Sequence, residues 1–294
     1  MRVLITGAAG FIGSHLVDRL RMQHEVFALA GNSNHKSPSN VQWIEADLSR
    51  RLDHSDLPPR VDAIIHLAQS KYYREFPQQA DDIFAVNVAG SFNLLEYARQ
   101  AGAAKFIFAS TGGVYGYSYE KFVETDPVNP LNFYLTSKHI AELLVGNYQQ
   151  FFDTTVLRLF FVYGAGQKPT MLIPRLVRSV VAGDPVTLQG SDGLHINPVH
   201  VTDAVTAFER ALELSGHHLI NVGGPQVLTL REIANIIGER VGCEPVFTFE
   251  DKEPSHLVGD ITKMSALLGP PRIPLREGVV ELCDEARQEQ TAGR

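Results

Sequence analysis

The sequence predicts an α/β fold in which helices cover both faces of a parallel sheet. Apolar runs typical of buried strands alternate with segments of helical periodicity through the first half of the chain. This alternation indicates parallel strands, because parallel strands are connected through crossover helices. The strand-like runs are residues 3–5, 26–29, 63–67, 105–108 and 156–159.

The first of these runs leads directly into a glycine-rich turn, Thr6-Gly-Ala-Ala-Gly-Phe-Ile-Gly13, and then into a helical pattern. Gly7 would permit the tight turn, Gly10 would let backbone amides approach a pyrophosphate, and Gly13 would let the helix pack closely on its strand. The helix that begins near Phe11 would direct its N-terminus toward the anion. The order strand, glycine turn, helix predicts a dinucleotide-binding domain of the Rossmann type, and the alternative is a plain strand-to-helix turn.

Tyr134 and Lys138 form the second informative pattern. On a helix, side chains four residues apart lie on one face with Cβ atoms roughly 5–6 Å apart. A free phenol titrates near pH ~10, and a neighbouring ammonium favours the phenolate. Upstream, Ser110 and Thr111 each offer a hydroxyl that could hold the same substrate oxygen. The pattern predicts alcohol–carbonyl chemistry with proton exchange at Tyr134, and the alternative is a solvated helix face.

Composition narrows the class of protein. The chain has 294 residues, 44% hydrophobic content and a net charge of -7, which suits a large core and two lobes and disfavours nucleic acid as a partner. No stretch approaches the roughly 20 apolar residues of a membrane span, and a strand starting at Arg2 leaves no room for a signal peptide. Cys243 and Cys283 lack metal or redox spacing. We therefore expect a cytoplasmic protein without a membrane partner and without a metal site.

Taken together, these residues resemble the extended short-chain dehydrogenase/reductase family, and within it the nucleotide-sugar epimerases and dehydratases of the UDP-glucose 4-epimerase-like type. The resemblance runs from Met1 to about Arg287. Besides the glycine turn, the matching segments are Asp47-Leu48, His66-Leu-Ala68, Asn87-Val88, Ser110-Thr-Gly-Gly-Val-Tyr-Gly116, Tyr134-Leu-Thr-Ser-Lys138, Leu157-Arg158, Val162-Tyr-Gly164, and Asn197-Pro-Val-His-Val201 followed by Asp203.

The resemblance implies an NAD-dependent enzyme with a role for each matching residue. Tyr134 would be the acid/base, Lys138 would hold the cofactor ribose and lower the pKa of the phenol, and Thr111 would bond the reacting oxygen. The expected cofactor contacts are Gly7, Gly10, Phe11, Ile12, Gly13, Asn32, Asp47, Leu48, Leu67, Ala68, Asn87, Ser110, Tyr134 and Lys138. The expected substrate contacts are Lys71, Tyr72, Gly112, Arg158, Phe161, Lys168 and His195. The alternatives are a plain surface loop at Tyr72-Tyr73-Arg74 and a structural role for His195.

Helices around residues 84–100 and 134–150 resemble those of the family's dimer-forming four-helix bundle, so we expect a homodimer. Within the first of these segments we expect a helix over residues 83–99. Its buried stripe would consist of Phe84, Val88, Phe92 and Leu95.

Three departures from the family pattern affect the expected function. Ala30-Gly31-Asn32-Ser33 stands where NAD-preferring members carry an acid, so NADP remains open beside NAD, with Asn32, Ser33, His35 or Lys36 meeting a 2′-phosphate. The usual asparagine after Arg-x-Phe is Phe161, and His195-Ile196 replaces an arginine, which weakens the expected diphosphate grip. Gly112-Gly113 follow Thr111 where dehydratases and decarboxylases of the family place acidic residues.

We therefore expect residues 1–165 to form the dinucleotide-binding domain, with residues 196–212 returning to it. Residues 166–294 would form a smaller, discontinuous C-terminal substrate lobe. The expected activity is NAD(P)-dependent epimerisation of a nucleoside-diphosphate sugar through a transient keto sugar. The alternatives are a sugar dehydrogenase or reductase with net cofactor turnover and a non-catalytic dinucleotide sensor.

Overall fold

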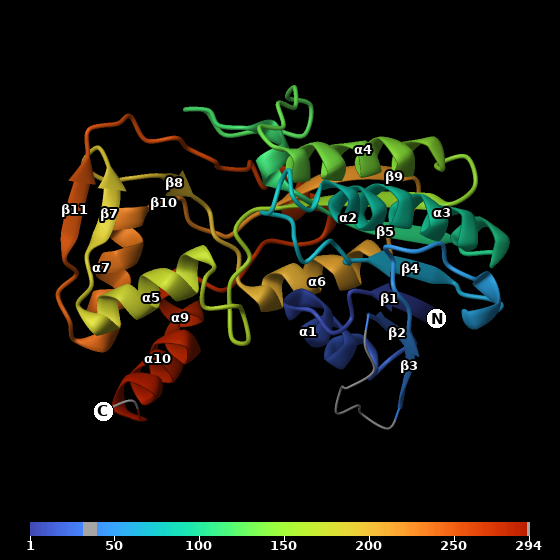
Figure 1. Ribbon diagram of the computed structural model, residues 1–294, viewed down its shortest axis with the longest axis horizontal. Helices are drawn as coiled ribbons and strands as arrows, with labels where there is room; N and C mark the ends of the chain where they lie inside the picture. Colours follow the sequence, from blue (N-terminus) through green and yellow to red (C-terminus); the bar gives the residue numbers. More distant parts are fainter. Residues whose placement is uncertain (32–39, 293–294) are drawn as a thin grey trace. The chain divides into compact units, whose positions relative to one another are not determined.

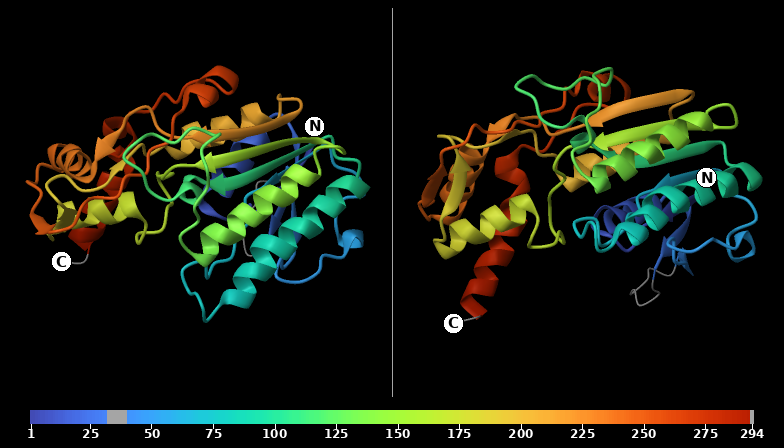
Figure 2. Two further views of the ribbon diagram at one scale, coloured as in Figure 1. Left: turned by 90° about the horizontal axis from the view of Figure 1, so that it is seen from above. Right: turned by 45° about the horizontal axis from the view of Figure 1, so that its top comes forward.

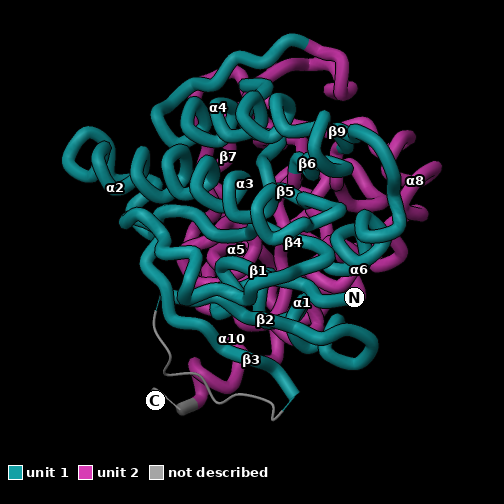
Figure 3. Tube along the Cα trace, turned by 90° about the vertical axis from the view of Figure 1, so that its right-hand side faces the viewer, with its two compact units in different colours: residues 1–116, 127–158, 205–220 teal, residues 117–126, 159–204, 221–294 magenta. Residues whose placement is uncertain are grey.

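The computed structural model describes residues 1–31 and 40–292. Within it the chain divides into two compact units (Figure 3). Unit 1 comprises residues 1–116, 127–158 and 205–220, and unit 2 comprises residues 117–126, 159–204 and 221–294.

A seven-stranded sheet forms the centre of unit 1, with the strand order β3-β2-β1-β4-β5-β6-β9. Its strands are β1 (Arg2–Thr6), β2 (Glu25–Ala30), β3 (Val41–Glu45), β4 (Ala63–His66), β5 (Lys105–Thr111), β6 (Asp153–Leu159) and β9 (His217–Val222). The pairs β1–β2, β2–β3, β1–β4 and β4–β5 are parallel, so the carboxyl ends of β1, β4 and β5 meet at one edge. The predicted fold class, a Rossmann-type doubly wound α/β sheet, is confirmed.

Helices cover both faces of this sheet (Figure 1). One face carries α2 (Ala80–Phe84), a π-helical segment (Ala85–Ala89), α3 (Gly90–Gln100) and α4 (Phe133–Asn147), whereas α1 (Phe11–Leu20) and α6 (Val201–Ala211) lie on the other. Figure 2 shows α3 and α4 side by side, and the two helices pack against each other. The apolar core beneath them is built from residues such as Leu4, Ile64, Leu94 and Phe106, each fully buried. Short 3-10 turns occupy His54–Asp56 and Gly112–Tyr115.

The buried stripe predicted for the helix over residues 83–99 is wrong at two of its four positions. Val88 and Leu95 are buried, but Phe84 and Phe92 are about half exposed, at 50% and 46%. The π-helical segment Ala85–Ala89 inserts extra backbone per turn, so a pattern spaced for an uninterrupted α-helix loses its register across it. Asn87 and Ser91 lie on the buried side instead.

Unit 2 has its own apolar core, which includes Tyr163, Val177, Leu188, Ile233 and Val279. Its helices are α5 (Leu172–Ala182), α7 (Leu230–Val241), α8 (Thr262–Leu267), α9 (Leu275–Gly278) and α10 (Val280–Ala292). Two small sheets pair β7 (Val186–Gln189) with β11 (Phe247–Glu250), and β8 (His195–Ile196) with β10 (Leu228–Thr229). None of the helices within the described residues of the chain is both long and apolar enough to span a membrane.

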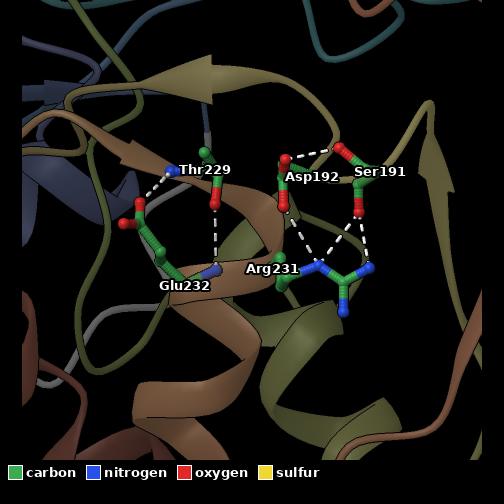
Figure 4. Close-up of polar contacts among 5 residues, drawn as sticks. All are labelled: Ser191, Asp192, Thr229, Arg231 and Glu232. Atoms are coloured by element: carbon green, nitrogen blue, oxygen red, sulfur yellow. Dashed lines mark hydrogen bonds and ion pairs between the residues drawn. The ribbon is translucent and has the colours of Figure 1, made fainter.

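A capping box fixes the start of α7 (Figure 4). Thr229 Oγ1 accepts a hydrogen bond from the Glu232 amide at 3.0 Å, and the Glu232 carboxylate accepts one from the Thr229 amide at 2.8 Å. The neighbouring Arg231 donates to the Ser191 carbonyl oxygen and to the Asp192 carboxylate, so it ties the turn after β7 to this helix. These local contacts organise unit 2 without contributing to the predicted site.

Candidate active site

The glycine turn at the end of β1 adopts the geometry that its sequence predicts. Gly7 has φ +66°, a left-handed backbone conformation that residues with a side chain rarely adopt. A Cβ at this position would lie 2.8 Å from the Ala68 amide nitrogen. A Cβ on Gly13 would lie only 2.1 Å from the Gly7 carbonyl oxygen, so the start of α1 packs directly on the turn. Gly7 and Gly13 therefore set the path of the backbone between β1 and α1.

The N-terminus of α1 fits the pyrophosphate of a dinucleotide. The helix starts at Phe11 after Gly10, whose lack of a side chain leaves the first amides without a side-chain cap. Gly10 is exposed, and the amides of Phe11, Ile12 and Gly13 carry the positive end of the helix dipole. An NAD pyrophosphate could therefore be held by backbone donors here, as the sequence predicts.

Further expected cofactor residues lie on loops that follow the sheet strands. Leu67 and Ala68 directly follow β4 and are half-buried, while Asp47 and Leu48 follow β3. The Asp47 carboxylate accepts hydrogen bonds from the amide and hydroxyl of Ser49, which lower its pKa. Asn32, together with the alternative 2′-phosphate residues Ser33, His35 and Lys36, lies outside the described residues.

Asn87 occupies the π-helical segment and is buried, so its amide must find partners inside the protein. Its Oδ1 accepts a hydrogen bond from the Ser70 amide at 2.8 Å, and its Nδ2 donates to Ser137 Oγ at 2.9 Å. Ser137 Oγ in turn donates to the Tyr134 carbonyl oxygen at 2.7 Å. Asn87 therefore connects the loop after β4 to the first turn of α4.

Tyr134 lies in the first turn of α4, where Asn132 caps the helix through the Leu135 amide. Its phenol donates a hydrogen bond to Gln69 Oε1 at 2.8 Å, and its ring packs against Tyr73 with centroids 5.2 Å apart. Burial raises the pKa of Tyr134 above its ordinary value, and Tyr73 adds to the rise. The pKa is therefore raised where the sequence predicts a depression, because desolvation disfavours the phenolate.

Lys138 is 3% exposed, and its ammonium lies 4.2 Å from the centroid of the Phe108 ring. Burial lowers the pKa of Lys138 from 10.5 to about 7, and the charge of Glu142 only partly opposes this. Near neutral pH the side chain is therefore only partly cationic, which weakens its influence on the phenol. A negatively charged or hydroxyl-bearing ligand at this position would favour the ammonium form.

The two hydroxyls at the end of β5 have different partners. Ser110 Oγ donates to the buried Glu142 carboxylate. Thr111 Oγ1 accepts the Gly113 amide at 3.1 Å, which leaves the threonine proton available to a ligand oxygen. Of the two candidates for holding the reacting oxygen, the geometry favours Thr111.

Arg158 is also engaged inside unit 1. It is 3% exposed and makes a bidentate ion pair with Glu142, at 3.0 Å through Nε and 2.6 Å through Nη2. Burial acts to lower the pKa of Arg158, but the hydrogen bonds and charge of Glu142 outweigh it and raise the pKa. The structure thus places Arg158 in an internal ion pair with Glu142.

The other expected substrate contacts lie in both units. In unit 1, Lys71 is exposed with its ammonium 4.7 Å from the centroid of the Tyr72 ring, and Gly112 is buried at the start of the turn after β5. In unit 2, Phe161 has φ 47°, Lys168 is exposed, and the His195 ring packs against His256 in a tilted arrangement at a centroid distance of 4.0 Å. The described residues contain no group of three His, Cys, Asp or Glu side chains placed to hold a metal ion.

Sequence reasoning missed Gln69, Glu142 and the hydrogen-bonding role of His66. Glu142 could have been found as the acid four residues after Lys138 on the same helix face. His66 was visible as the polar end of the apolar run Ala63-Ile-Ile-His66. Gln69 carried no signal in the sequence, because its contact with Tyr134 depends on how the loop after β4 folds.

The fold and these residues define a dinucleotide-binding α/β protein with a Tyr-x-x-x-Lys pair at the carboxyl edge of a parallel sheet. The model of the NAD dependent epimerase/dehydratase family matches residues 3–223. The chain belongs to this family, and NAD is accordingly its cofactor.

Individual relatives cover nearly the whole chain. The uncharacterized UDP-glucose epimerase YtcB of Bacillus subtilis is 31% identical over 95% of this chain and 96% of its own length. UDP-glucuronic acid decarboxylase 1 of Xenopus tropicalis is 28% identical over 98% of this chain and 72% of its own. The structure is similar, with a TM-score of 0.88 and 27% identity, to UDP-glucuronic acid 4-epimerase from Bacillus cereus in complex with UDP-glucuronic acid and NAD. This match covers 98% of this chain and 100% of that one.

Proposed function

We propose that the protein is an NAD-dependent epimerase of a UDP-linked sugar. The observation that carries the proposal is the arrangement at the ends of β5 and α4, which offers the proton-exchanging Tyr134, the buried Lys138 and the hydroxyl of Thr111, followed by two glycines. The names of YtcB and of the Bacillus cereus epimerase support this choice of substrate class.

In the proposed reaction, bound NAD would supply the hydride chemistry by which the sugar is oxidised and then reduced again. Thr111 donates a hydrogen bond to the reacting hydroxyl oxygen, and Tyr134 removes the hydroxyl proton. The proton returns from Tyr134 once the keto sugar has turned over. Tyr134 must be the phenolate before it accepts this proton, and the Lys138 ammonium stabilises that negative charge. The backbone amides at the start of α1 hold the pyrophosphate in place throughout.

Decarboxylases are among the relatives, so this reaction is the main competing function. Gly112 and Gly113 follow Thr111, and neither carries a side chain that could handle a second proton there. A Cβ at Gly113 would lie 2.8 Å from Leu135 Cδ2, so a larger residue would also crowd α4. The absence of an acidic side chain at Gly112 and Gly113 favours epimerisation over decarboxylation.

Replacing Tyr134 tests the chemical assignment. Tyr134→Phe removes the phenol oxygen, and turnover of a UDP-sugar should fall by at least ~10²-fold, because a positioned acid/base typically contributes ~10²–10⁴-fold. Tyr148→Phe is the matched control, since it removes a hydroxyl that bonds Glu96 at the other end of α4. Product formation is followed by chromatography of the UDP-sugars. Similar turnover in both variants would contradict the assignment.

We also propose that the protein forms a homodimer through α3 and α4. These adjacent helices and the preceding α2 leave Phe84, Phe92 and Leu143 about half exposed. Two such helices from each copy would form a four-helix bundle and bury these side chains. Phe92→Glu should yield a monomer in light scattering, whereas Phe249→Glu, at an exposed phenylalanine of unit 2, should not. A wild type that is monomeric at micromolar concentration would refute the proposal.

A further inference from the structure

His66 is a buried, titratable side chain to which the proposed reaction assigns no role. It ends β4, is 0% exposed, and is paired in register with Thr6, the last residue of β1. Both ring nitrogens are within hydrogen-bond distance of hydroxyl groups: Nδ1 lies 2.7 Å from Thr6 Oγ1 and Nε2 lies 2.9 Å from Ser91 Oγ. An imidazole with two buried partners has a fixed orientation.

The neighbours of His66 determine its tautomer. Ser91 Oγ donates its only proton to the Asn87 carbonyl oxygen at 2.6 Å, so it must accept a hydrogen bond from Nε2 of His66. Nε2 therefore carries the proton, and Nδ1 accepts from the Thr6 hydroxyl. Thr6 Oγ1 in turn accepts the Ala68 amide at 3.3 Å. Burial and then the charge of Lys138 lower the pKa of His66 to about 3, so the ring stays neutral.

From Ser91, these hydrogen bonds continue to α4, the helix that carries Tyr134 and Lys138. The Asn87 carbonyl oxygen accepts a hydrogen bond from Ser91 Oγ, and the Asn87 side-chain amide donates one to Ser137 Oγ. Ser137 Oγ in turn donates a hydrogen bond to the Tyr134 carbonyl oxygen. A second connection runs through rings, since Phe108 packs on His66 at 5.4 Å and carries the Lys138 ammonium over its face at 4.2 Å. Thr6, the residue that leads into Gly7, is thereby linked to both Tyr134 and Lys138.

We propose that His66, held as the neutral Nε2–H tautomer between Thr6 and Ser91, is a positioning residue that aligns the glycine turn with Tyr134 and Lys138. The inference rests on the proposed function, because its main readout is epimerase turnover. His66 is 0% exposed, so any effect on the reaction passes through its neighbours. It acts through Ser91, Asn87 and Ser137 on the reacting phenol and through Phe108 on the ammonium.

Ser91→Ala tests the proposal with the smallest change, because it removes one fully buried hydroxyl and breaks the link to Asn87. We expect kcat to fall at least about tenfold with KM within about threefold, since displacement of a reacting group by a fraction of an ångström has effects of this size. The acid limb of the pH profile of kcat should shift as well, because the environments of Tyr134 and Lys138 change. His66→Phe should show the same pattern, and His66→Gln, which keeps a donor near Nε2, should recover part of kcat.

The chain supplies a matched control. Thr154, like Thr6, is 0% exposed and bonds the Nδ1 of a histidine, His217, on a neighbouring strand. Thr154 lies at the start of β6, however, whereas Thr6 lies at the end of β1, so the two threonines occupy opposite edges of the sheet. Thr6→Val should lower kcat and shift the pH profile, and Thr154→Val should lower only the melting temperature.

Two outcomes would overturn the proposal. One is a kcat and a pH profile that Ser91→Ala and His66→Phe leave unchanged. The other is an equal loss of kcat in Thr6→Val and Thr154→Val. NAD affinity, measured by calorimetry on the cofactor-free protein, should weaken in Thr6→Val and His66→Phe and not in Thr154→Val. A wild type that binds NAD but does not epimerise UDP-sugars would instead refute the proposed function, and the NAD affinities would still decide whether His66 aligns the glycine turn.

Discussion

Replacing Lys138 by methionine should stabilise the cofactor-free protein at neutral pH. Lys138 is 3% exposed, and burial lowers its pKa from 10.5 to about 7. Each pKa unit corresponds to about 1.4 kcal/mol, so the buried ammonium destabilises the folded state by roughly 5 kcal/mol relative to the neutral amine. Methionine has a similar length and carries no charge, so the variant removes this penalty.

The direction of the pH dependence follows from the same shift. Between pH 7 and 10.5 the unfolded chain binds more protons at this lysine than the folded protein does, so this group makes stability rise with pH across that window. Below pH 7 both states are protonated and the penalty is fully present. Lys138→Met should therefore gain most at pH 7 and least at pH 9.5.

The assay is urea unfolding of cofactor-free protein at these two pH values, for wild type, Lys138→Met and the control Lys121→Met. Lys121 is exposed, so its replacement should shift stability little and equally at both pH values. Half of the expected gain at pH 7, about 2–3 kcal/mol, would already be resolved by this method. Parallel pH dependences of wild type and Lys138→Met would refute the description of Lys138 as a desolvated, weakly basic group.

Three further predictions follow from local geometry. Gly13→Ala, whose Cβ would lie 2.1 Å from the Gly7 carbonyl oxygen, should weaken NAD binding at least about tenfold by calorimetry, whereas Gly146→Ala, with open space around its Cβ, should leave it unchanged. Phe161 has φ 47°, so the Phe161→Gly variant should be about 1 kcal/mol more stable than Phe161→Ala. If chemical denaturation finds the alanine variant more stable, backbone strain at Phe161 is excluded. Glu142→Gln should lose about 3–5 kcal/mol by leaving the buried Arg158 unpaired, and adding Arg158→Met should recover much of that loss; no recovery would contradict the ion-pair assignment.

The parts of the fold that could be predicted are those specified by contiguous residues. Strand β1, the glycine turn and α1 form one continuous segment, so their order alone indicated a dinucleotide site. Strand β3 was missed because Val-Gln-Trp-Ile-Glu is an edge strand with mixed exposure, and β9 because it begins with two histidines. The buried stripe of the helix over residues 83–99 failed because a π-helical segment has no recognisable sequence signature.

In the site too, features carried by residues close in sequence were predictable, and contacts between distant residues were not. Tyr134 and Lys138 were predictable because their spacing places both on one face of α4. The contacts of Ser110 and Arg158 with Glu142 were not predictable, because both side chains meet Glu142 only when β5, β6 and α4 pack together. Likewise, the link from Thr6 through His66 to Ser91 joins residues 60 and 25 positions apart, and no local pattern reports such contacts.

The central claim is that the cofactor is restored within each turnover, which distinguishes an epimerase from a dehydrogenase or reductase with net cofactor use. The most direct measurement incubates the wild-type protein with a UDP-sugar and catalytic NAD while the epimer ratio and the absorbance of reduced nicotinamide are recorded together. We expect the sugar to approach an equilibrium mixture of epimers over many turnovers, with no accumulation of reduced nicotinamide beyond the amount of enzyme. Oxidised sugar and reduced nicotinamide that accumulate in equal amounts, without any epimer, would contradict the account.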